Sequence, residues 1–426
     1  MCIKTQEIFS VRGSITLTKK LCADCEDMTS PEDQKPRALC GQPLPDSSSG
    51  RNNPDASGRE DMIGLSRQEL SERLAALGER SFRVRQIWQW LYNRGVRDIQ
   101  DMTNLSRETR ARLEGDFYIS RPVMTQQHVS EDGTCKWLFK FRDTNEAETV
   151  YIPETERGSV CISTQVGCTL TCRFCHTGTQ ALVRNLGATE IVGQFLVARD
   201  AYGEWPTPNE SRRLLSNIVL MGMGEPLFNY ENTVAALKIL TDPEGISLSK
   251  RRVTLSTSGV VPRMYDLGRD IDVNLAVSLH AAQDDIRDQI MPINKKWPLR
   301  DLMQACRDYP AVSNARRITF EYVMLKGIND SDADARALAQ LVKGIPCKFN
   351  LIPFNKWPGS DYDCSSSARI ERFSDILYTY GYSAPIRRPR GRDILAACGQ
   401  LKSASARARR ARVLQNPDPV EQGTNA

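Results

Sequence analysis

The sequence contains no long uncharged apolar run, and no stretch approaches the ~18–20 residues that a membrane-spanning helix needs. The first 20 residues include lysines but no apolar segment of the kind that a secretory signal requires. A net charge of +5 on 426 residues is small, so charge alone indicates no particular class of partner. Because 40% of the residues are hydrophobic, the chain can bury a large core. We therefore expect a cytoplasmic, globular protein without membrane contact.

Aromatic residues are absent between positions 10 and 60, and residues 41–58 are mostly Gly, Pro, Ser and Asn. Such a segment buries too little apolar surface to offset its ordering entropy, so we expect residues 1–58 to be a disordered extension. It contains a CxxC pair at Cys22 and Cys25. A zinc knuckle would need two more ligands, which only Cys2 and Cys40 could supply nearby. We interpret the CxxC as a chance pair.

Residues 59–117 show a helical pattern and are expected to form a small accessory domain. A helix expected at residues 81–93 places Trp90 and Tyr92 off its apolar stripe, so both aromatic rings are predicted to be exposed. Four arginines and no acidic residue accompany this helix: Arg83, Arg85, Arg94 and Arg97. Arginines beside exposed aromatic rings suit RNA phosphates and bases. A solvated face on a three-helix domain explains the same composition equally well.

The rest of the chain alternates between β-rich and helical patterns. Residues 118–155 are expected to form a β-rich connector, and residues 156–400 contain repeated strand–helix units. The six apolar β-rich runs are residues 160–164, 218–221, 253–255, 273–277, 318–323 and 347–352. Six such units predict a parallel, barrel-like sheet, whose chemistry gathers at the C-terminal ends of the strands. Residues 401–426 are rich in basic residues and are expected to be a flexible tail.

Thirteen cysteines are an odd number for a chain without an export signal, which favours metal binding or thiol chemistry over a disulfide scaffold. The densest group is Cys168, Cys172 and Cys175, spaced CxxxCxxC directly after the first predicted barrel strand. Three thiolates on a cubane of four irons leave one iron open for substrate chemistry. Zinc, with Cys161 or His176 as a fourth ligand, is the alternative that this spacing leaves open.

The cysteine triplet resembles the signature of the radical S-adenosylmethionine (SAM) enzymes. The resemblance implies a partial (β/α)6 barrel, similar to a TIM barrel, that holds a [4Fe-4S] cluster. It also implies that SAM binds the open iron through its amino and carboxylate groups. One electron from the cluster then cleaves SAM to a 5′-deoxyadenosyl radical. This expected fold agrees with the six strand–helix units counted above.

Polar motifs follow four of the predicted strands, where a barrel would place a cofactor site. The glycines of MGMGEP allow close backbone approach, and a carboxylate can accept hydrogen bonds from an ammonium group. The further motifs are STSG, SLH and LIPFN. Each motif alone is a weak signal, but together they line one rim of the predicted barrel. The residues that they contribute are Gly224, Glu225, Ser256, Ser278, Leu279, His280 and Asn355.

Two cysteines outside the triplet lie in specific surroundings. Cys161 precedes the triplet, and Cys398 follows the basic loop RRPRGRD, which suits phosphates. By themselves both are typical of ordinary buried thiols, as are the remaining ones: Cys135, Cys306, Cys347 and Cys364. The surrounding motifs change that interpretation. Residues 62–401 resemble the bacterial dual-specificity rRNA/tRNA adenine-C2 methyltransferases of the RlmN type. The motifs that carry this resemblance are VYIP, CISTQVGC, GMGEPL, SKRRVTLSTSG, SLHA, LIPFN and ACGQL.

This resemblance implies a ping-pong reaction on adenosine of 23S rRNA (at the peptidyl transferase centre) and of tRNA (3′ of the anticodon). Cys398 would take a methyl group from one SAM, and a radical from a second SAM would activate it for addition to carbon 2 of adenine. Cys161 would release the covalent RNA adduct through a transient Cys161–Cys398 disulfide, and Glu148 would accept the proton. By the same resemblance Cys168, Cys172 and Cys175 hold the cluster, while the seven motif residues above bind SAM. The implied partners are the two RNAs and a reductant such as flavodoxin, and a monomer is expected.

Three alternatives remain at this stage. A sister group methylates carbon 8 of the same rRNA adenosine with the same two-cysteine chemistry, and the GMGEPL and INKKWPL motifs favour carbon 2. A non-catalytic zinc- or RNA-binding protein would contain zinc and would not cleave SAM. Methylthiotransferases need an additional amino-terminal cysteine cluster, which the cysteines of residues 1–58 do not convincingly supply.

Overall fold

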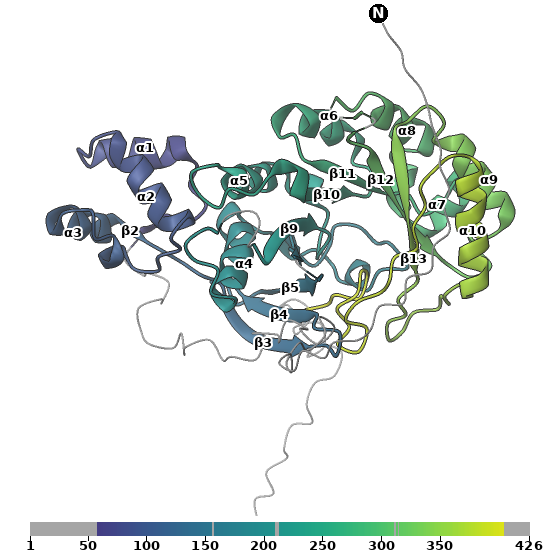
Figure 1. Cartoon of the computed structure of the whole chain (residues 1–426), viewed down its shortest axis with the longest axis horizontal. Helices are drawn as coiled ribbons and strands as arrows, with labels where there is room; N and C mark the ends of the chain where they lie inside the picture. The colour runs from purple at the N-terminus through teal and green to yellow at the C-terminus, as the bar shows by residue number, and fades with distance from the viewer. Residues whose placement is uncertain (1–57, 156, 209–212, 311, 314, 404–426) are drawn as a thin grey trace, which may run out of the picture. The chain divides into compact units, whose positions relative to one another are not determined.

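A nine-stranded mixed sheet organises the part of the chain that the computed structural model describes (Figure 1). The described residues are 58–403, without 156, 209–212, 311 and 314. The expected disordered extension up to residue 57, with its Cys22–Cys25 pair, therefore lies outside the described residues. The expected tail from residue 404 onward lies outside them as well.

Six consecutive strands form the parallel part of this sheet, as the strand–helix pattern predicted. They are β6 (Gly158–Cys161), β9 (Leu215–Leu220), β10 (Val253–Thr257), β11 (Asn274–Ser278), β12 (Ile318–Met324) and β13 (Cys347–Pro353). The helices of the units are α4 (Ala188–Ala201), α5 (Tyr230–Thr241), α6 (Val261–Asp270), α7 (Asp284–Ile290), α8 (Leu299–Arg307), α9 (Asp332–Leu341) and α10 (Ser367–Thr379). Apolar side chains of the strands and of these helices form the hydrophobic core, so the β-rich runs are buried. All six C-terminal strand ends therefore lie at one edge of the sheet.

Three antiparallel strands extend the same sheet beyond β6. They are β3 (Val123–Val129), β4 (Cys135–Lys140) and β5 (Glu146–Pro153), and β5 pairs antiparallel with β6. The strands expected in the connector therefore exist, and their hydrogen bonds continue into the parallel part. The domain boundary near residue 155 stays a prediction.

The amino-terminal region contains three helices, as expected, and a short parallel pair of strands. The helices are α1 (Arg67–Ala76), α2 (Phe82–Tyr92) and α3 (Arg107–Asp116), and β1 (Glu60–Asp61) pairs with β2 (Phe117–Tyr118). The Ser66 side chain caps α1 by accepting a hydrogen bond from the Glu69 N–H, and the Glu69 carboxylate accepts one from the Ser66 N–H in return. No helix among the described residues is both long and apolar enough to cross a membrane.

The predicted exposure of Trp90 and Tyr92 was wrong, because both side chains are buried. The Tyr92 hydroxyl accepts a hydrogen bond from the Gly64 N–H at 3.1 Å. Trp90 Nε1 donates to Asn104 Oδ1 at 2.5 Å, and the Arg94 guanidinium lies 4.4 Å from the Trp90 ring centroid. Helix α2 thus packs on more than the single face that its apolar stripe indicated, since hydrogen bonds satisfy the polar atoms of the two rings.

The arginines near α2 have partners within the chain. Arg85 pairs with Glu244 at 2.6 Å and Arg97 with Asp200 at 2.8 Å. Arg83 lies 3.6 Å from Glu79. The Arg85 and Arg97 pairs join the helical region to the loop after α5 and to α4, so intramolecular contacts occupy charges that the composition alone left available for RNA.

Candidate active site

A β-hairpin with a long loop carries the three cysteines of the CxxxCxxC motif. Strands β7 (Gln165–Val166) and β8 (Arg184–Asn185) pair antiparallel and enclose the intervening loop. Gly167 begins the loop with φ +77°, and a Cβ at this position would collide with the Ala181 carbonyl oxygen. A glycine is therefore required where the two sides of the loop come closest.

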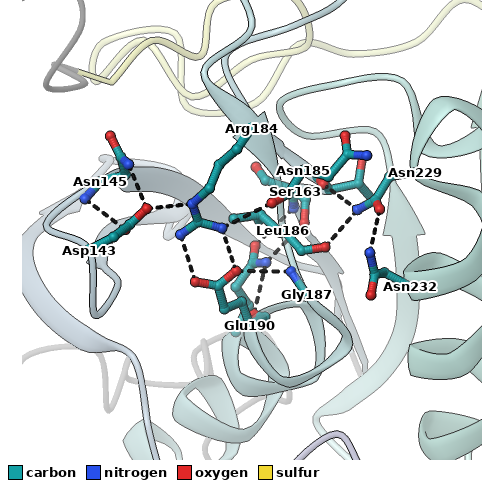
Figure 2. A network of polar contacts seen from close by, with 12 residues as sticks. Asp143, Asn145, Ser163, Arg184, Asn185, Leu186, Gly187, Glu190, Asn229 and Asn232 are labelled. Atoms are coloured by element: carbon teal, nitrogen blue, oxygen red, sulfur yellow. Dashed lines mark hydrogen bonds and ion pairs between the residues drawn. The ribbon is translucent and has the colours of Figure 1, made fainter. Parts of the chain in front are cut away.

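A polar network ties the far end of this hairpin to the sheet and to α4, as Figure 2 shows. The Arg184 guanidinium donates to both Glu190 oxygens, at 2.7 and 2.8 Å, and its Nε donates to Asp143 Oδ2 at 2.5 Å. Asn229 Nδ2 donates to the Leu186 carbonyl at 2.7 Å. Bidentate arginine–carboxylate pairs have fixed geometry, so the end of the cysteine loop has a defined position.

The three cysteine thiols line one cavity at the C-terminal edge of the parallel strands. Burial raises the pKa of each thiol, to about 12 for Cys168, and the neighbouring thiols of the triplet raise the pKa values of Cys168 and Cys172 further. Three buried thiolates therefore need bound cations to stay deprotonated. Among the described residues, no group of three His, Cys, Asp or Glu side chains converges as a single metal ion requires. A cubane, in contrast, binds each thiolate at a different iron, so this set of donors fits a cluster.

The same cavity collects most of the residues predicted to bind SAM. The predicted residues that line it are Gly224, Glu225, Ser256, Ser278, His280 and Asn355. Leu279 is the exception, since its side chain is buried in the hydrophobic core and its N–H donates to the Glu321 carbonyl at 3.1 Å.

Gly224 and Glu225 occupy a densely packed turn after β9. Gly224 has φ +101°, and a Cβ there would lie 2.5 Å from the Gln165 Cβ. The Gln165 amide oxygen accepts a hydrogen bond from the Glu225 N–H at 3.0 Å, so the turn is tied to β7. The Glu225 carboxylate accepts hydrogen bonds from the Leu227 and Ser258 N–H groups, at 3.1 and 2.8 Å. Burial raises its pKa, whereas these backbone bonds lower it.

His280 presents a neutral imidazole to the cavity. Its Nδ1 accepts a hydrogen bond from the Val323 N–H at 3.0 Å, which leaves the proton on Nε2. Burial, together with the charge of Arg287, lowers the pKa of His280 to about 3. The backbone at His280 is left-handed, with φ +59°, and the Asn329 side chain holds its carbonyl at 2.7 Å. His280 can therefore donate a hydrogen bond to a ligand but does not carry charge at neutral pH.

Cys398 and Cys161 meet at a second cavity that adjoins the first. Cys398 lines both cavities, whereas Cys161 lines only the second. Burial raises the pKa of the Cys161 thiol to about 12, the nearby Cys398 raises it further, and the charge of Arg387 acts in the opposite direction. Arg387 also lines both cavities, and Arg388 and Arg390 line the second. The basic RRPR loop therefore lies beside the two cysteines.

The residues after Cys175 hold the segment that carries Cys398. The His176 N–H donates to the Gly399 carbonyl at 2.7 Å, and the Thr177 hydroxyl donates to the Leu401 carbonyl at 2.6 Å. The His176 ring stacks on Trp357 at 4.8 Å, and its Nδ1 lies 3.2 Å from the Gln400 carbonyl oxygen. His176, the alternative zinc ligand, is thus engaged with the carboxy-terminal segment. The cysteine loop and the Cys398 segment form one connected structure.

Glu148 lies outside both cavities. Its Oε1 pairs with Lys136 Nζ at 3.0 Å, and its Oε2 accepts a hydrogen bond from the Lys402 N–H at 2.7 Å. Burial raises the pKa of the Glu148 carboxyl, and Lys136 lowers it. Lys136 Nζ also donates to the Leu395 carbonyl at 3.3 Å. One buried ion pair therefore holds residues on both sides of Cys398.

The sequence analysis did not identify three charged residues that shape this region: Lys136, Arg287 and Glu321. Arg287 is fully buried on α7 and donates to the carbonyls of Ser258, Ser278 and Leu279. Glu321 is a buried acid in the otherwise uncharged strand β12, and that contrast was a signal available in the sequence.

The remaining cysteines that the structure describes are mostly ordinary core residues. Cys135, Cys306 and Cys347 are buried, as expected. Cys364 is only half-buried, because it lies in the loop between β13 and α10 that borders solvent. The expectation that all four are buried was therefore wrong for Cys364.

Comparisons with known proteins agree with this arrangement. Residues 60–119 match the family described as "Ribosomal RNA large subunit methyltransferase N-terminal domain", and residues 162–339 match the radical SAM superfamily. A protein of Rhodospirillum rubrum named "Dual-specificity RNA methyltransferase RlmN" is 59% identical over 391 residues, which cover 90% of this chain and 91% of that protein. A protein of the same name from Paramagnetospirillum magneticum is 65% identical over 353 residues, covering 82% of this chain and 77% of that protein.

The fold is also similar to a solved structure. A crystal structure of a radical SAM methyltransferase from Sphaerobacter thermophilus matches with a TM-score of 0.75 and 43% identity, covering 80% of this chain and 99% of that one. Membership of the radical SAM superfamily implies a [4Fe-4S] cluster and SAM as cofactors, which the cysteine loop and its cavity fit. The chain belongs to the RlmN family of dual-specificity RNA methyltransferases, which are radical SAM enzymes.

Proposed function

We propose that this enzyme methylates carbon 2 of adenosine in 23S rRNA, at the peptidyl transferase centre, and in tRNA, at the adenosine 3′ of the anticodon. Carbon 2 of adenine is electron-poor and does not attack a methyl sulfonium directly, so a radical route is required. The names of the relatives, which specify dual-specificity RNA methyltransferases, support this substrate class. We also propose that the enzyme is cytoplasmic, acts as a monomer and receives electrons from a reductant such as flavodoxin.

The protein's own residues divide the reaction between two sulfur atoms. When bound, the cluster at Cys168, Cys172 and Cys175 and two SAM molecules per turnover would supply a methyl group and a 5′-deoxyadenosyl radical. The Cys398 thiolate takes the methyl group by displacement at the methyl carbon. After loss of one hydrogen from this S-methyl group, its carbon bonds to carbon 2 of adenine. The adduct then loses the proton of carbon 2 and one electron, which the bound cluster would accept. The Cys161 thiolate attacks the Cys398 sulfur, the bond between this sulfur and the methylene carbon breaks, and that carbon takes up a proton to become the methyl group as the disulfide forms. The reductant returns the disulfide to two thiols before the next cycle.

A single observation carries this proposal: Cys398 lies in the wall that the two cavities share, with Cys161 in the second cavity. A sulfur in that wall can face a cofactor on one side and an RNA base on the other. The arginines of the second cavity supply positive charge for the phosphates of the RNA strand. The high pKa of Cys161 keeps this thiol neutral and unreactive at the start of the cycle.

Glu148 is our proposed proton acceptor, although its two oxygens are engaged by Lys136 and Lys402. Because Glu148 lines neither cavity, a proton from carbon 2 can reach it only after the structure around it rearranges. We therefore infer that the segment around Cys398 moves during the cycle. Burial favours the protonated form of Glu148, which suits a group that must take up a proton.

Mass spectrometry of nucleosides tests the regiochemistry. Cluster-loaded enzyme incubated anaerobically with reductant, SAM and unmodified 23S rRNA or tRNA should yield 2-methyladenosine. The appearance of 8-methyladenosine instead would assign the enzyme to the carbon-8 chemistry.

Two variants test the roles of the sulfur atoms. Cys398→Ala should retain the cluster but form neither S-methylcysteine nor product, and normal product would refute the ping-pong scheme. Cys161→Ala should accumulate a covalent protein–RNA adduct that migrates slowly on denaturing gels. If only free protein is seen with Cys161→Ala, this residue does not resolve the adduct.

A further inference from the structure

Two aromatic side chains outside both cavities join the cysteine loop to the loop after β13. The His176 ring lies flat on Trp357, with the ring centroids 4.8 Å apart and an angle of 6° between the planes. Trp357 Nε1 donates a hydrogen bond to the Phe174 carbonyl at 3.0 Å. Both residues of the pair are 8% exposed, and neither lines one of the two cavities. The pair can therefore influence the reaction only through other residues.

Gln400 connects this pair to the backbone around Cys398. His176 Nδ1 lies 3.2 Å from the Gln400 carbonyl oxygen, and because a carbonyl oxygen only accepts, Nδ1 carries the proton of this hydrogen bond. The Gln400 side-chain amide donates to the Lys356 carbonyl at 2.8 Å, and its oxygen accepts from the Ala397 N–H at 3.2 Å. The segment on both sides of Cys398 is thus tied to the stacked pair and its loop.

Neighbours of the pair also bind the backbone of Cys398 and Gly399 directly. The backbone N–H of His176 donates to the Gly399 carbonyl at 2.7 Å, and Asn355 Nδ2 donates to the Cys398 carbonyl at 3.3 Å. A cysteine side chain has one torsion with three staggered rotamers, so a fixed backbone leaves its sulfur only three positions. These contacts therefore determine where the Cys398 sulfur lies relative to the cysteine loop.

We propose that His176 and Trp357 are positioning residues for methyl transfer from SAM to Cys398, an inference that rests on the proposed function. In this step the Cys398 thiol releases its proton to solvent and its sulfur bonds to the methyl carbon. The bond from that carbon to the SAM sulfonium breaks, which leaves S-adenosylhomocysteine. Displacement requires the sulfur to lie in line with the bond that breaks, and misplacement by about 1 Å can cost on the order of 100-fold in rate. Because the loop that carries the pair also carries the cysteine triplet, the pair would fix the Cys398 sulfur relative to SAM.

Single-turnover methylation of Cys398 in anaerobic, cluster-loaded protein tests this proposal. Mass spectrometry first establishes that Cys398 is a free thiol and then follows its methylation by SAM. A parallel reaction with iodoacetamide, which needs no cofactor site, measures the reactivity of the same thiol. In His176→Ala and Trp357→Leu, methylation at saturating SAM should be on the order of 10- to 100-fold slower than in the wild-type protein. Alkylation should not slow, and the affinity for S-adenosylhomocysteine in calorimetry should stay the same, because neither side chain lines the SAM cavity.

A conservative variant and a second tryptophan provide controls. Trp357→Phe retains a ring that can stack on His176, so it should recover most of the methylation rate that Trp357→Leu loses. Trp297 is a partly buried tryptophan whose ring centroid lies 6.4 Å from that of Phe228, and it lines neither cavity. Trp297→Leu should therefore leave methylation of Cys398 unchanged. Iron content and circular dichroism establish that each variant folds and holds the cluster.

Three outcomes would contradict this inference in distinguishable ways. Wild-type rates of methylation in His176→Ala and Trp357→Leu would refute the positioning role alone. Equal slowing of methylation and of alkylation would mean that the pair supports the fold around Cys398 and not the alignment of its sulfur. A wild-type protein that forms no S-methylcysteine would refute the proposed function, and this inference with it. If Trp357→Leu does not hold the cluster, His176→Ala decides the test.

Discussion

The Lys136–Glu148 pair makes a quantitative prediction about the segment that carries Cys398. The two side chains are 11% and 7% exposed, and their charged atoms lie 3.0 Å apart. Lys136→Met would leave the Glu148 carboxylate buried without a counter-ion and would remove the bond to the Leu395 carbonyl. Removing one partner of a buried pair typically costs about 3–5 kcal/mol of unfolding free energy.

A double-mutant cycle separates this charge effect from loss of packing. Glu148→Gln leaves the Lys136 ammonium without its carboxylate, whereas the double variant leaves neither charge buried. The double variant should therefore be more stable than the sum of the single losses predicts, by about 1.5 kcal/mol or more. Urea unfolding of the cluster-loaded protein measures the free energies. Losses that add within about 0.5 kcal/mol would refute the reasoning.

The pH dependence of Lys136→Met has a defined sign. Burial raises the pKa of Glu148 above its value of 4.5 in the unfolded chain, and loss of Lys136 raises it further. The folded variant then holds a proton at a pH where the unfolded chain has released it, so stability falls as pH rises from about 4.5 through the folded pKa. The part of the destabilisation that comes from the unpaired carboxylate should therefore be full above the folded pKa and disappear towards pH 4.5, while the loss of the bond to the Leu395 carbonyl stays.

Hydrogen exchange reports whether the pair holds the Cys398 segment. The amides of residues 395–403 should exchange faster in Lys136→Met than in the wild-type protein, because contacts on both sides of Cys398 are weakened. Amides of helix α9 serve as an internal reference, since that helix does not contact the pair. Unchanged exchange in residues 395–403 would mean that the cysteine loop alone positions Cys398.

Three further predictions concern the strand ends around the SAM cavity. His280 has a pKa of about 3 in the folded protein against 6.5 for the free side chain. The folded protein therefore binds fewer protons than the unfolded chain, and its stability falls as pH falls below 6.5. In urea unfolding, His280→Asn should reduce this loss by up to about 2 kcal/mol between pH 6.5 and 5. Gly224→Ala should weaken SAM binding in calorimetry because its Cβ meets Gln165, whereas Gly344→Ala, with similar φ and open space, should not. Arg287→Met should lower the unfolding free energy by about 3–5 kcal/mol, since several buried carbonyls lose their donor, and equal stability would contradict the role given to this guanidinium.

Much of the site was predictable because its chemistry is local in the sequence or repeats with the fold. Cys168, Cys172 and Cys175 lie within eight residues, so their spacing alone brings them to one loop. The motifs after β9, β10, β11 and β13 are far apart in the sequence, but consecutive parallel strands end at the same edge. Counting strand–helix units therefore sufficed to expect that Glu225, Ser256 and Asn355 share a cavity.

Other features depend on pairings that no local pattern encodes. The exposure of Trp90 and Tyr92 was predicted wrongly because a helical stripe identifies one packing face, whereas α2 buries more than one. The partners of Glu148 could not be predicted either, because Lys402 is 254 residues away and contributes a backbone N–H, which every residue except proline carries. The residue types in the sequence do not reveal contacts of this kind.

The sequence by itself determined the cysteine loop, the six strand–helix units of a parallel sheet and the edge at which the polar motifs meet. These properties follow from short spacings and from periodicities of two and 3.6 residues. Only the tertiary structure decided that Cys398 lies in a wall between two cavities, and that Glu321 is buried beside one of them. The physical reason is that burial and register are set by how distant segments pack, and a side chain acquires its environment only when those segments have met.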